Sequence, residues 1–180
     1  RNLSIKEAKN LLNQSPHELL SVIVSKNKTS EEICNYNSEL NPDLLQVHIS
    51  KEDFPPLLKK LPRSIRRKLI IPIKGDIKNV EEIMGKPKYL NEIFAILLDS
   101  SEGSGTKINL NYAEQMVKRF ESHCRIILSG GIGPSNIDSI LNLIDPMGID
   151  CSSALEDPHT GQKDPELIKK FLKNIRKYMN

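Results

Sequence analysis

Apolar residues recur along the chain in six short runs that have the composition of β-strands. The starts of these runs lie 25, 25, 25, 31 and 23 residues apart. The runs are apolar almost throughout rather than at every second position, which is typical of parallel strands covered on both faces. We therefore expect strands at 19–25, 44–49, 69–74, 94–99, 125–129 and 148–152.

The segments between these runs carry apolar residues at the spacing of amphipathic helices. Ser4 stands three residues before Glu7, which is the spacing of a capping box at a helix start. Thr29 and Ser30 precede a second helical stretch, and Pro165 suits the first turn of the last one. The expected helices cover residues 4–13, 31–36, 79–84, 109–120, 134–143 and 165–178.

Strands that alternate with helices predict an α/β fold with a parallel sheet and right-handed crossovers. Two architectures remain open at this point: an open doubly wound sheet, or part of a (β/α)8 TIM barrel. The chain supplies about six βα units and a leading helix, whereas eight units of ~25 residues need ~200 residues. As a barrel, residues 1–180 form a single domain that lacks the first strand, the first helix and the second strand, about 35 residues.

Composition narrows the class of protein and its partners. Of the 180 residues, 38% are hydrophobic and 27% charged, as in an ordinary globular domain. The net charge of +3 is too small to predict a nucleic-acid partner, and we expect the densest basic run, 63–68, to be a solvated helix end. No apolar stretch reaches the length of a membrane span, and the chain opens on polar residues rather than a signal peptide.

The three cysteines, Cys34, Cys124 and Cys151, have no CxxC spacing. Neither a disulfide framework nor a metal site is therefore expected, and a cytoplasmic location fits best. Strand alternation turns Cys151 away from the face of Asp150, so we expect it to be a core thiol.

Residue 1 is Arg rather than Met, so we expect the chain to be processed, truncated or incompletely represented.

In both candidate architectures the active site lies at the carboxyl ends of the strands. Asp99 ends the fourth apolar run after five apolar residues, where burial would favour the protonated carboxyl that a general acid needs. The alternative is a helix cap or a turn residue. The small residues of 100–107 follow it and predict either a lid over a ligand or an ordinary loop.

Two further strand ends carry groups that suit a phosphate. Gly130 and Gly131 follow the fifth strand and precede a helix start, where backbone N–H groups and the helix dipole favour an anion. Ser152 and Ser153 follow the last strand and add two hydroxyls. One glycine-rich turn would be a weak signal. In phosphate-binding barrels, however, the loops after the last two strands form the site together.

Five motifs follow one another in the second half of the chain. They are Leu-Leu-Asp-Ser at 97–100, Gly-Ser-Gly at 103–105, Ser-Gly-Gly-Ile-Gly-Pro-Ser-Asn at 129–136, Asp-Cys-Ser-Ser-Ala-Leu-Glu at 150–156 and Gly-Gln-Lys-Asp at 161–164. Their order and spacing resemble those of the phosphoribosylanthranilate isomerase family of tryptophan biosynthesis. The resemblance spans the whole chain and is strongest after residue 94.

The resemblance implies a (β/α)8 barrel that carries out an Amadori rearrangement without a cofactor. The substrate would be N-(5-phosphoribosyl)anthranilate, and the product 1-(2-carboxyphenylamino)-1-deoxyribulose 5-phosphate. It also implies a small phosphorylated molecule as the ligand, no nucleic acid or membrane partner, and a monomer or homodimer. The matched positions are Asp99 as general acid, Gly130, Gly131, Ser152 and Ser153 around the phosphate, Asp150 near the substrate hydroxyls, and Arg1 on the anthranilate carboxylate.

The chain departs from the family pattern in ways that bear on function. The family's general base is a cysteine in a Lys-Ile-Cys-Gly motif, which is absent and is expected upstream of residue 1. Ala154 replaces a glycine and would be strained if that position needs a positive φ. Two alternatives therefore stay open: an inactive or truncated relative that binds a phosphorylated ligand, or another phosphosugar isomerase or epimerase on the same barrel.

Overall fold

The computed structural model describes residues 3–74, 82, 87–99 and 109–178, which form two compact units. Of the described residues, the first unit comprises 3–72 and 87–95, and the second comprises 73–74, 82, 96–99 and 109–178. Apart from residue 82, the expected helix at 79–84 lies outside the described residues. The expected lid at 100–107 and Arg1 lie outside them as well.

The first unit holds three strands that pair in parallel and in chain order. Strand β1 pairs with β2 from Val22 opposite Leu44, and β2 pairs with β3 from Leu45 opposite Leu69. Strand β1 begins three residues later than expected, because Pro16 to Leu19 form a hydrogen-bonded turn. The elements of the first unit are α1 (Ile5–Gln14), β1 (Val22–Lys26), α2 (Ser30–Leu40), β2 (Leu44–His48), α3 (Phe54–Lys60), α4 (Arg63–Arg66), the start of β3 (Leu69–Lys74) and α6 (Pro87–Leu90).

Two of the predicted helix starts, those of α1 and α2, are closed by capping boxes. In α1 the Glu7 N–H donates to the Ser4 hydroxyl at 3.3 Å, and the Ser4 N–H donates to the Glu7 carboxylate at 2.7 Å. In α2 Thr29 and Glu32 make the same reciprocal pair at 3.2 and 2.9 Å. Each box satisfies two backbone N–H groups that a helix start would otherwise leave to water.

Helices α3 and α4 were not predicted, although the chain between β2 and β3 must cross from one strand to the next. Pro55 and Pro56 argue against a helix at this place in the sequence, because proline normally interrupts a helix. Here both lie in the first turn, where a missing N–H is harmless. The basic run 63–68, expected to be a solvated helix end, contains the whole of the four-residue α4, and its Arg66 is half-buried and forms an ion pair with Glu92.

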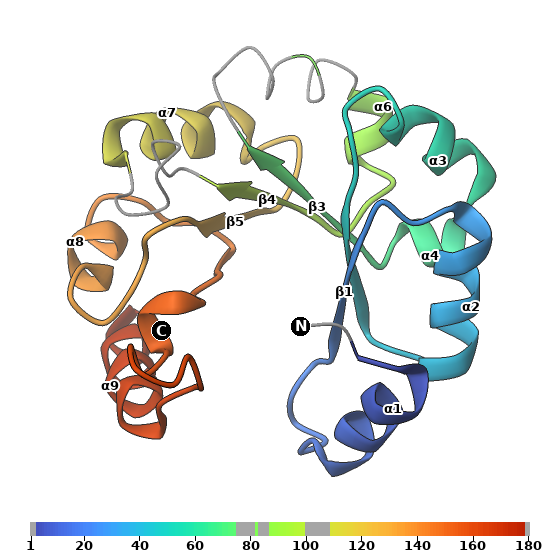
Figure 1. Cartoon of the computed structure of the whole chain (residues 1–180). Helices are drawn as coiled ribbons and strands as arrows, with labels where there is room; N and C mark the ends of the chain where they lie inside the picture. The colour runs from blue at the N-terminus through green and yellow to red at the C-terminus, as the bar shows by residue number, and fades with distance from the viewer. Residues whose placement is uncertain (1–2, 75–81, 83–86, 100–108, 179–180) are drawn as a thin grey trace. The chain divides into compact units, whose positions relative to one another are not determined.

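The second unit repeats the pattern with strands β4, β5 and β6, again parallel and in chain order. In Figure 1, α7, α8 and α9 (yellow to red) lie along one side of these strands. Helices on a single face are typical of a barrel, whereas a doubly wound sheet carries them on both faces. The elements of the second unit are β4 (Ala95–Asp99), α7 (Leu110–Phe120), β5 (Ile126–Ser129), α8 (Ile137–Leu141), β6 (Gly148–Ile149), the 3-10 turn η1 (Ser153–Leu155), α9 (Pro165–Ile175) and the 3-10 turn η2 (Arg176–Tyr178).

The core of this unit forms between the strands and the apolar stripes of the helices. The stripe expected on 109–120 is present, and Asn109 caps α7 by accepting the Tyr112 N–H at 3.0 Å. The buried side chains include Ile96, Leu98, Ile126 and Leu128 of the strands, Ala113, Met116, Val117 and Phe120 of α7, Ile137 and Ile140 of α8, and Phe171 of α9.

No helix in the described ranges is both long and apolar enough to span a membrane.

Thr29→Ala should lower the free energy of unfolding by about 1 kcal/mol, because the Glu32 N–H loses its capping acceptor. Urea unfolding followed by circular dichroism measures the change. Thr29→Ser keeps the hydroxyl and should stay close to the parent protein. An equal loss in both variants would show that the hydroxyl does not act as a cap.

Candidate functional site

Three polar residues lie at the same level on neighbouring strands of the second unit. Strand β4 pairs with β5 so that Asp99 is opposite Ser129. Strand β6 pairs Ile149 with Leu128, and the next residue, Asp150, donates its N–H to the Leu128 carbonyl at 2.7 Å. The carboxyl ends of β4, β5 and β6 therefore bring the predicted Asp99 and Asp150 to one edge of the strands.

The face that these residues occupy follows from strand alternation. Ile126 and Leu128, which are 4% and 0% exposed, lie on one face of β5. Ser129 alternates with Leu128 and lies on the opposite face, and a paired residue in a parallel ladder shares the face of its partner. Asp99 therefore takes the same face as Ser129. Its side chain is half-buried, which is compatible with a group that meets a ligand.

The loop after β5 is a tight turn built on glycine. Gly130 and Gly131 have φ values of 96° and 65°, a region that favours glycine. The Asn136 amide folds the turn by donating to the Gly131 carbonyl and accepting the Gly133 N–H, both at 2.8 Å. Because of this turn α8 begins at Ile137, so the helix expected over 134–143 is only five residues long. The loop expected to bind a phosphate is thus a closed turn rather than a direct helix start.

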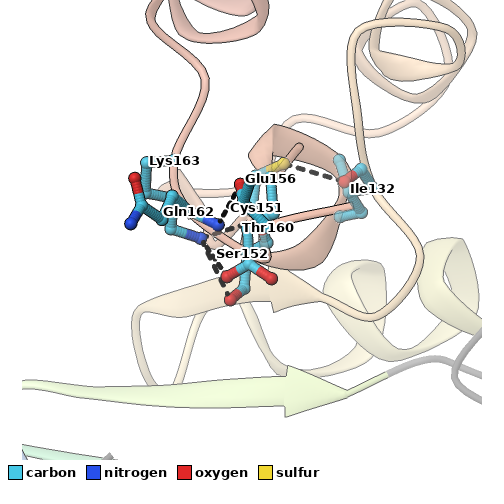
Figure 2. Close-up of polar contacts among 7 residues, drawn as sticks. All are labelled: Ile132, Cys151, Ser152, Glu156, Thr160, Gln162 and Lys163. Carbon is cyan, nitrogen blue, oxygen red and sulfur yellow. Dashed lines mark hydrogen bonds and ion pairs between the residues drawn. The ribbon is translucent and has the colours of Figure 1, made fainter. Parts of the chain in front are cut away.

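The loop after β6 carries Ser152 and Ser153, whose residues are both exposed. Strand β6 is two residues long rather than the expected five, because the chain bends at Cys151 and enters η1 at Ser153. Lys163 holds this bend (Figure 2). Its amine donates to the Ser152 carbonyl at 2.8 Å and to the Glu156 carboxylate at 2.9 Å.

Lys163 is the main residue that sequence reasoning missed. The Gly-Gln-Lys-Asp motif was noted for its resemblance, but Lys163 was given no role. Its amine also lies 3.4 Å from the Ser152 hydroxyl, and its backbone forms an isolated antiparallel bridge with Glu156. The sequence signal is Gly161, a residue type that can turn the chain back, two residues before Lys163. In the structure Gly161 does so with a φ of 63°.

A thiol joins the two loops. Cys151 donates its S–H to the Ile132 carbonyl at 2.9 Å (Figure 2). The residue is only partly buried, so the expected core thiol instead lies between the loops. Burial raises the pKa of Cys151 to about 11, and the negative charge of Asp150 adds to the rise. Burial also raises the pKa of Cys124 to about 11. Neither thiol is therefore suited to act as a base at neutral pH.

The backbone angles test the strain expected of Ala154 at a left-handed position. In the described part of the chain, the non-glycine residues with positive φ are Asn27 and Asn41, so Ala154 has none of the strain that a left-handed position would impose. Within the same residues no group of three or more His, Cys, Asp and Glu side chains could hold a metal ion.

Comparison with known proteins settles which family this arrangement belongs to. The model of the N-(5'-phosphoribosyl)anthranilate (PRA) isomerase family matches residues 1–174. The chain belongs to this family. Among named isomerases, that of Methanococcus vannielii is 27% identical over 98% of this chain and 82% of its own length. That of a Sulfurihydrogenibium species is 30% identical over 96% of this chain and 79% of its own length.

Solved PRA isomerase structures share the fold. The enzyme from Thermococcus kodakaraensis superimposes with a TM-score of 0.72 at 24% identity, covering 98% of this chain and 83% of that chain. The enzyme from Thermotoga maritima also gives 0.72, at 22% identity, covering 97% and 82%. The fold class is therefore α/β of the (β/α)8 type, as predicted, and the doubly wound alternative is set aside.

Alkylation of Cys151 in the folded protein should be slow at pH 7–8 and accelerate up to about pH 11, because burial and Asp150 oppose the thiolate. Iodoacetamide labelling read by peptide mass spectrometry measures the rate. The same cysteine in denaturant should level off near its ordinary pKa of ~8.5. A plateau below pH 9 in the folded protein would contradict the assignment.

Proposed function

We propose that this chain catalyses the isomerisation of N-(5'-phosphoribosyl)anthranilate, with Asp99 as the general acid. The observation that carries the proposal is the strand register, which aligns Asp99 with Ser129 at the edge where both loops begin. Family membership supports the reaction, since the matched model and the curated relatives are named for it.

The proposed reaction has two proton transfers on different atoms of the sugar. Asp99 gives its proton to the furanose ring oxygen, the bond from that oxygen to C1 breaks, and a Schiff base forms. A base then takes the proton from C2, and the enolamine tautomerises to the amino-ketose. The family resemblance expects this base to be a cysteine upstream of Arg1, and the raised pKa values of Cys124 and Cys151 argue against either one.

The remaining groups are proposed to bind and orient the substrate. The backbone of Gly130 and Gly131 and the hydroxyls of Ser152 and Ser153 surround the phosphate, in support of which both serines are exposed and follow a strand end. Asp150 accepts hydrogen bonds from the sugar hydroxyls. Arg1 is assigned to the anthranilate carboxylate on the resemblance alone, since a guanidinium fork matches a carboxylate.

For partners and location we propose a small phosphorylated substrate, no nucleic acid or membrane partner, and a cytoplasmic protein. A solved structure describes the Thermotoga maritima enzyme as dimeric, from which monomers were generated. The present protein is accordingly proposed to be a monomer or a homodimer. Light scattering of the purified protein should give the mass of one or two chains, and a larger assembly would contradict this proposal.

Asp99→Asn should lower kcat by at least about a hundredfold, because an amide cannot deliver the proton, while the affinity for inorganic phosphate should stay within about twofold of the parent. Steady-state turnover and phosphate titration measure the two effects. Asp145→Asn, in an exposed loop segment, serves as the matched control and should leave both unchanged.

Near-normal turnover of Asp99→Asn would contradict its role as the acid. A parent protein that binds phosphate and does not turn over the substrate would instead favour the non-catalytic phosphate-binding alternative. Turnover of a different phosphosugar in preference to this substrate would favour the third alternative, an isomerase or epimerase of another specificity.

A further inference from the structure

Gly133 is glycine for a reason other than backbone conformation. Its φ lies outside the left-handed region, unlike those of Gly130 and Gly131. A Cβ added to Gly133, however, would lie 2.5 Å from the Cβ of Ala154. Two carbon atoms attract at separations of about 3.5–4.0 Å and repel well before 2.5 Å. The constraint on position 133 is therefore the methyl group of one residue in the neighbouring loop.

The loop that carries Gly133 cannot retreat easily. Gly133 is buried, and its N–H donates to the Asn136 side chain at 2.8 Å. Its carbonyl accepts the N–H groups of Asn136 and Ile137 at 3.2 and 3.1 Å. A shift of this loop would break the turn that holds the positive-φ glycines in place.

The loop that carries Ala154 is held as well. Leu155 is 8% exposed, donates its N–H to the Ser152 carbonyl at 3.0 Å and accepts the Asp164 N–H at 2.9 Å. Lys163 holds the same Ser152 carbonyl from the other side. Ala154 therefore cannot move away from Gly133 without carrying Ser152 and its neighbour with it.

The contact has room for one Cβ, and either residue could supply it. Apart from the Ala154 methyl, the nearest atom to a Cβ at position 133 is the Ala154 Cα, at 3.9 Å, which is ordinary van der Waals contact. Once the methyl of Ala154 is removed, a Cβ at position 133 therefore fits. The hydrogen bond from Cys151 to the Ile132 carbonyl runs beside this contact and joins the same two loops.

We propose that Gly133 and Ala154 are a coupled pair of positioning residues that sets the spacing of the two phosphate loops. The inference rests on the proposed function, in which Gly130, Gly131, Ser152 and Ser153 bind the substrate phosphate. The pair itself touches no substrate. It acts by fixing how far the turn of Gly130 and Gly131 lies from the serine hydroxyls. An added Cβ at position 133 pushes the two loops apart and therefore weakens phosphate binding.

The test compares Gly133→Ala, Ala154→Gly and the double variant G133A/A154G with the parent protein. Gly133→Ala should weaken the binding of inorganic phosphate at least tenfold and raise KM for the phosphorylated substrate by a similar factor, with a smaller change in kcat. The double variant should return both values to within about threefold of the parent. Gly148→Ala is the matched control, because a Cβ there lies 3.6 Å from its nearest neighbour, and it should change neither value.

Phosphate binding by Gly133→Ala equal to that of the parent would overturn the proposal, and so would a double variant no better than Gly133→Ala. If Gly133→Ala does not fold, thermal melting of the double variant decides: recovery of the parent melting temperature supports the pair, and no recovery overturns it. A failure of the proposed function is recognised separately, as a parent that binds phosphate without turning over the substrate.

Discussion

Backbone hydrogen bonds between parallel strands fix the level at which each strand ends, and in the second unit this level determines the site. Asp99 is opposite Ser129, and Asp150 follows the pair of Ile149 with Leu128. A slip of one residue would exchange the two faces of β5 and take Leu128 out of the position in which it is 0% exposed. The burial of Ile126 and Leu128 therefore holds the register, and the register holds the polar edge.

The loops at this edge are ordered mainly by hydrogen bonds and close contacts, and only to a small extent by charge. The ion pair of Lys163 with Glu156 is partly exposed, with side chains 43% and 23% accessible, and such pairs contribute at most about 1 kcal/mol. Its larger effect is positional, because the same amine holds the Ser152 carbonyl at 2.8 Å. The Asn136 amide plays the corresponding part in the loop after β5.

Sequence patterns predicted the parts of the fold that depend on repeated local preference. The strand at 69–74 and the cap at Ser4 appear as expected, because apolar runs and capping residues act over a few neighbours. Helix α3 was missed since Pro55 and Pro56 disrupt a helix everywhere except in its first turn. The late start of α8 comes from the Asn136 amide, which closes a turn onto Gly131 and Gly133. The role of Lys163 comes from its contact with Ser152, eleven residues earlier. Hydrophobic periodicity reports neither kind of hydrogen bond.

The chemistry of the thiols bears on how the two proton transfers are divided. A base must lose its proton near neutral pH, and burial holds Cys124 and Cys151 in the thiol form up to about pH 11. Asp150 strengthens this for Cys151, because its negative charge opposes a second one beside it. The carboxylate proposed to bind the sugar hydroxyls thus adds to the effect of burial on the pKa of the adjacent thiol, and the positive charge of Lys163 opposes it. In the protonated form the thiol donates to Ile132, so protonation of Cys151 contributes to the loop geometry rather than to catalysis.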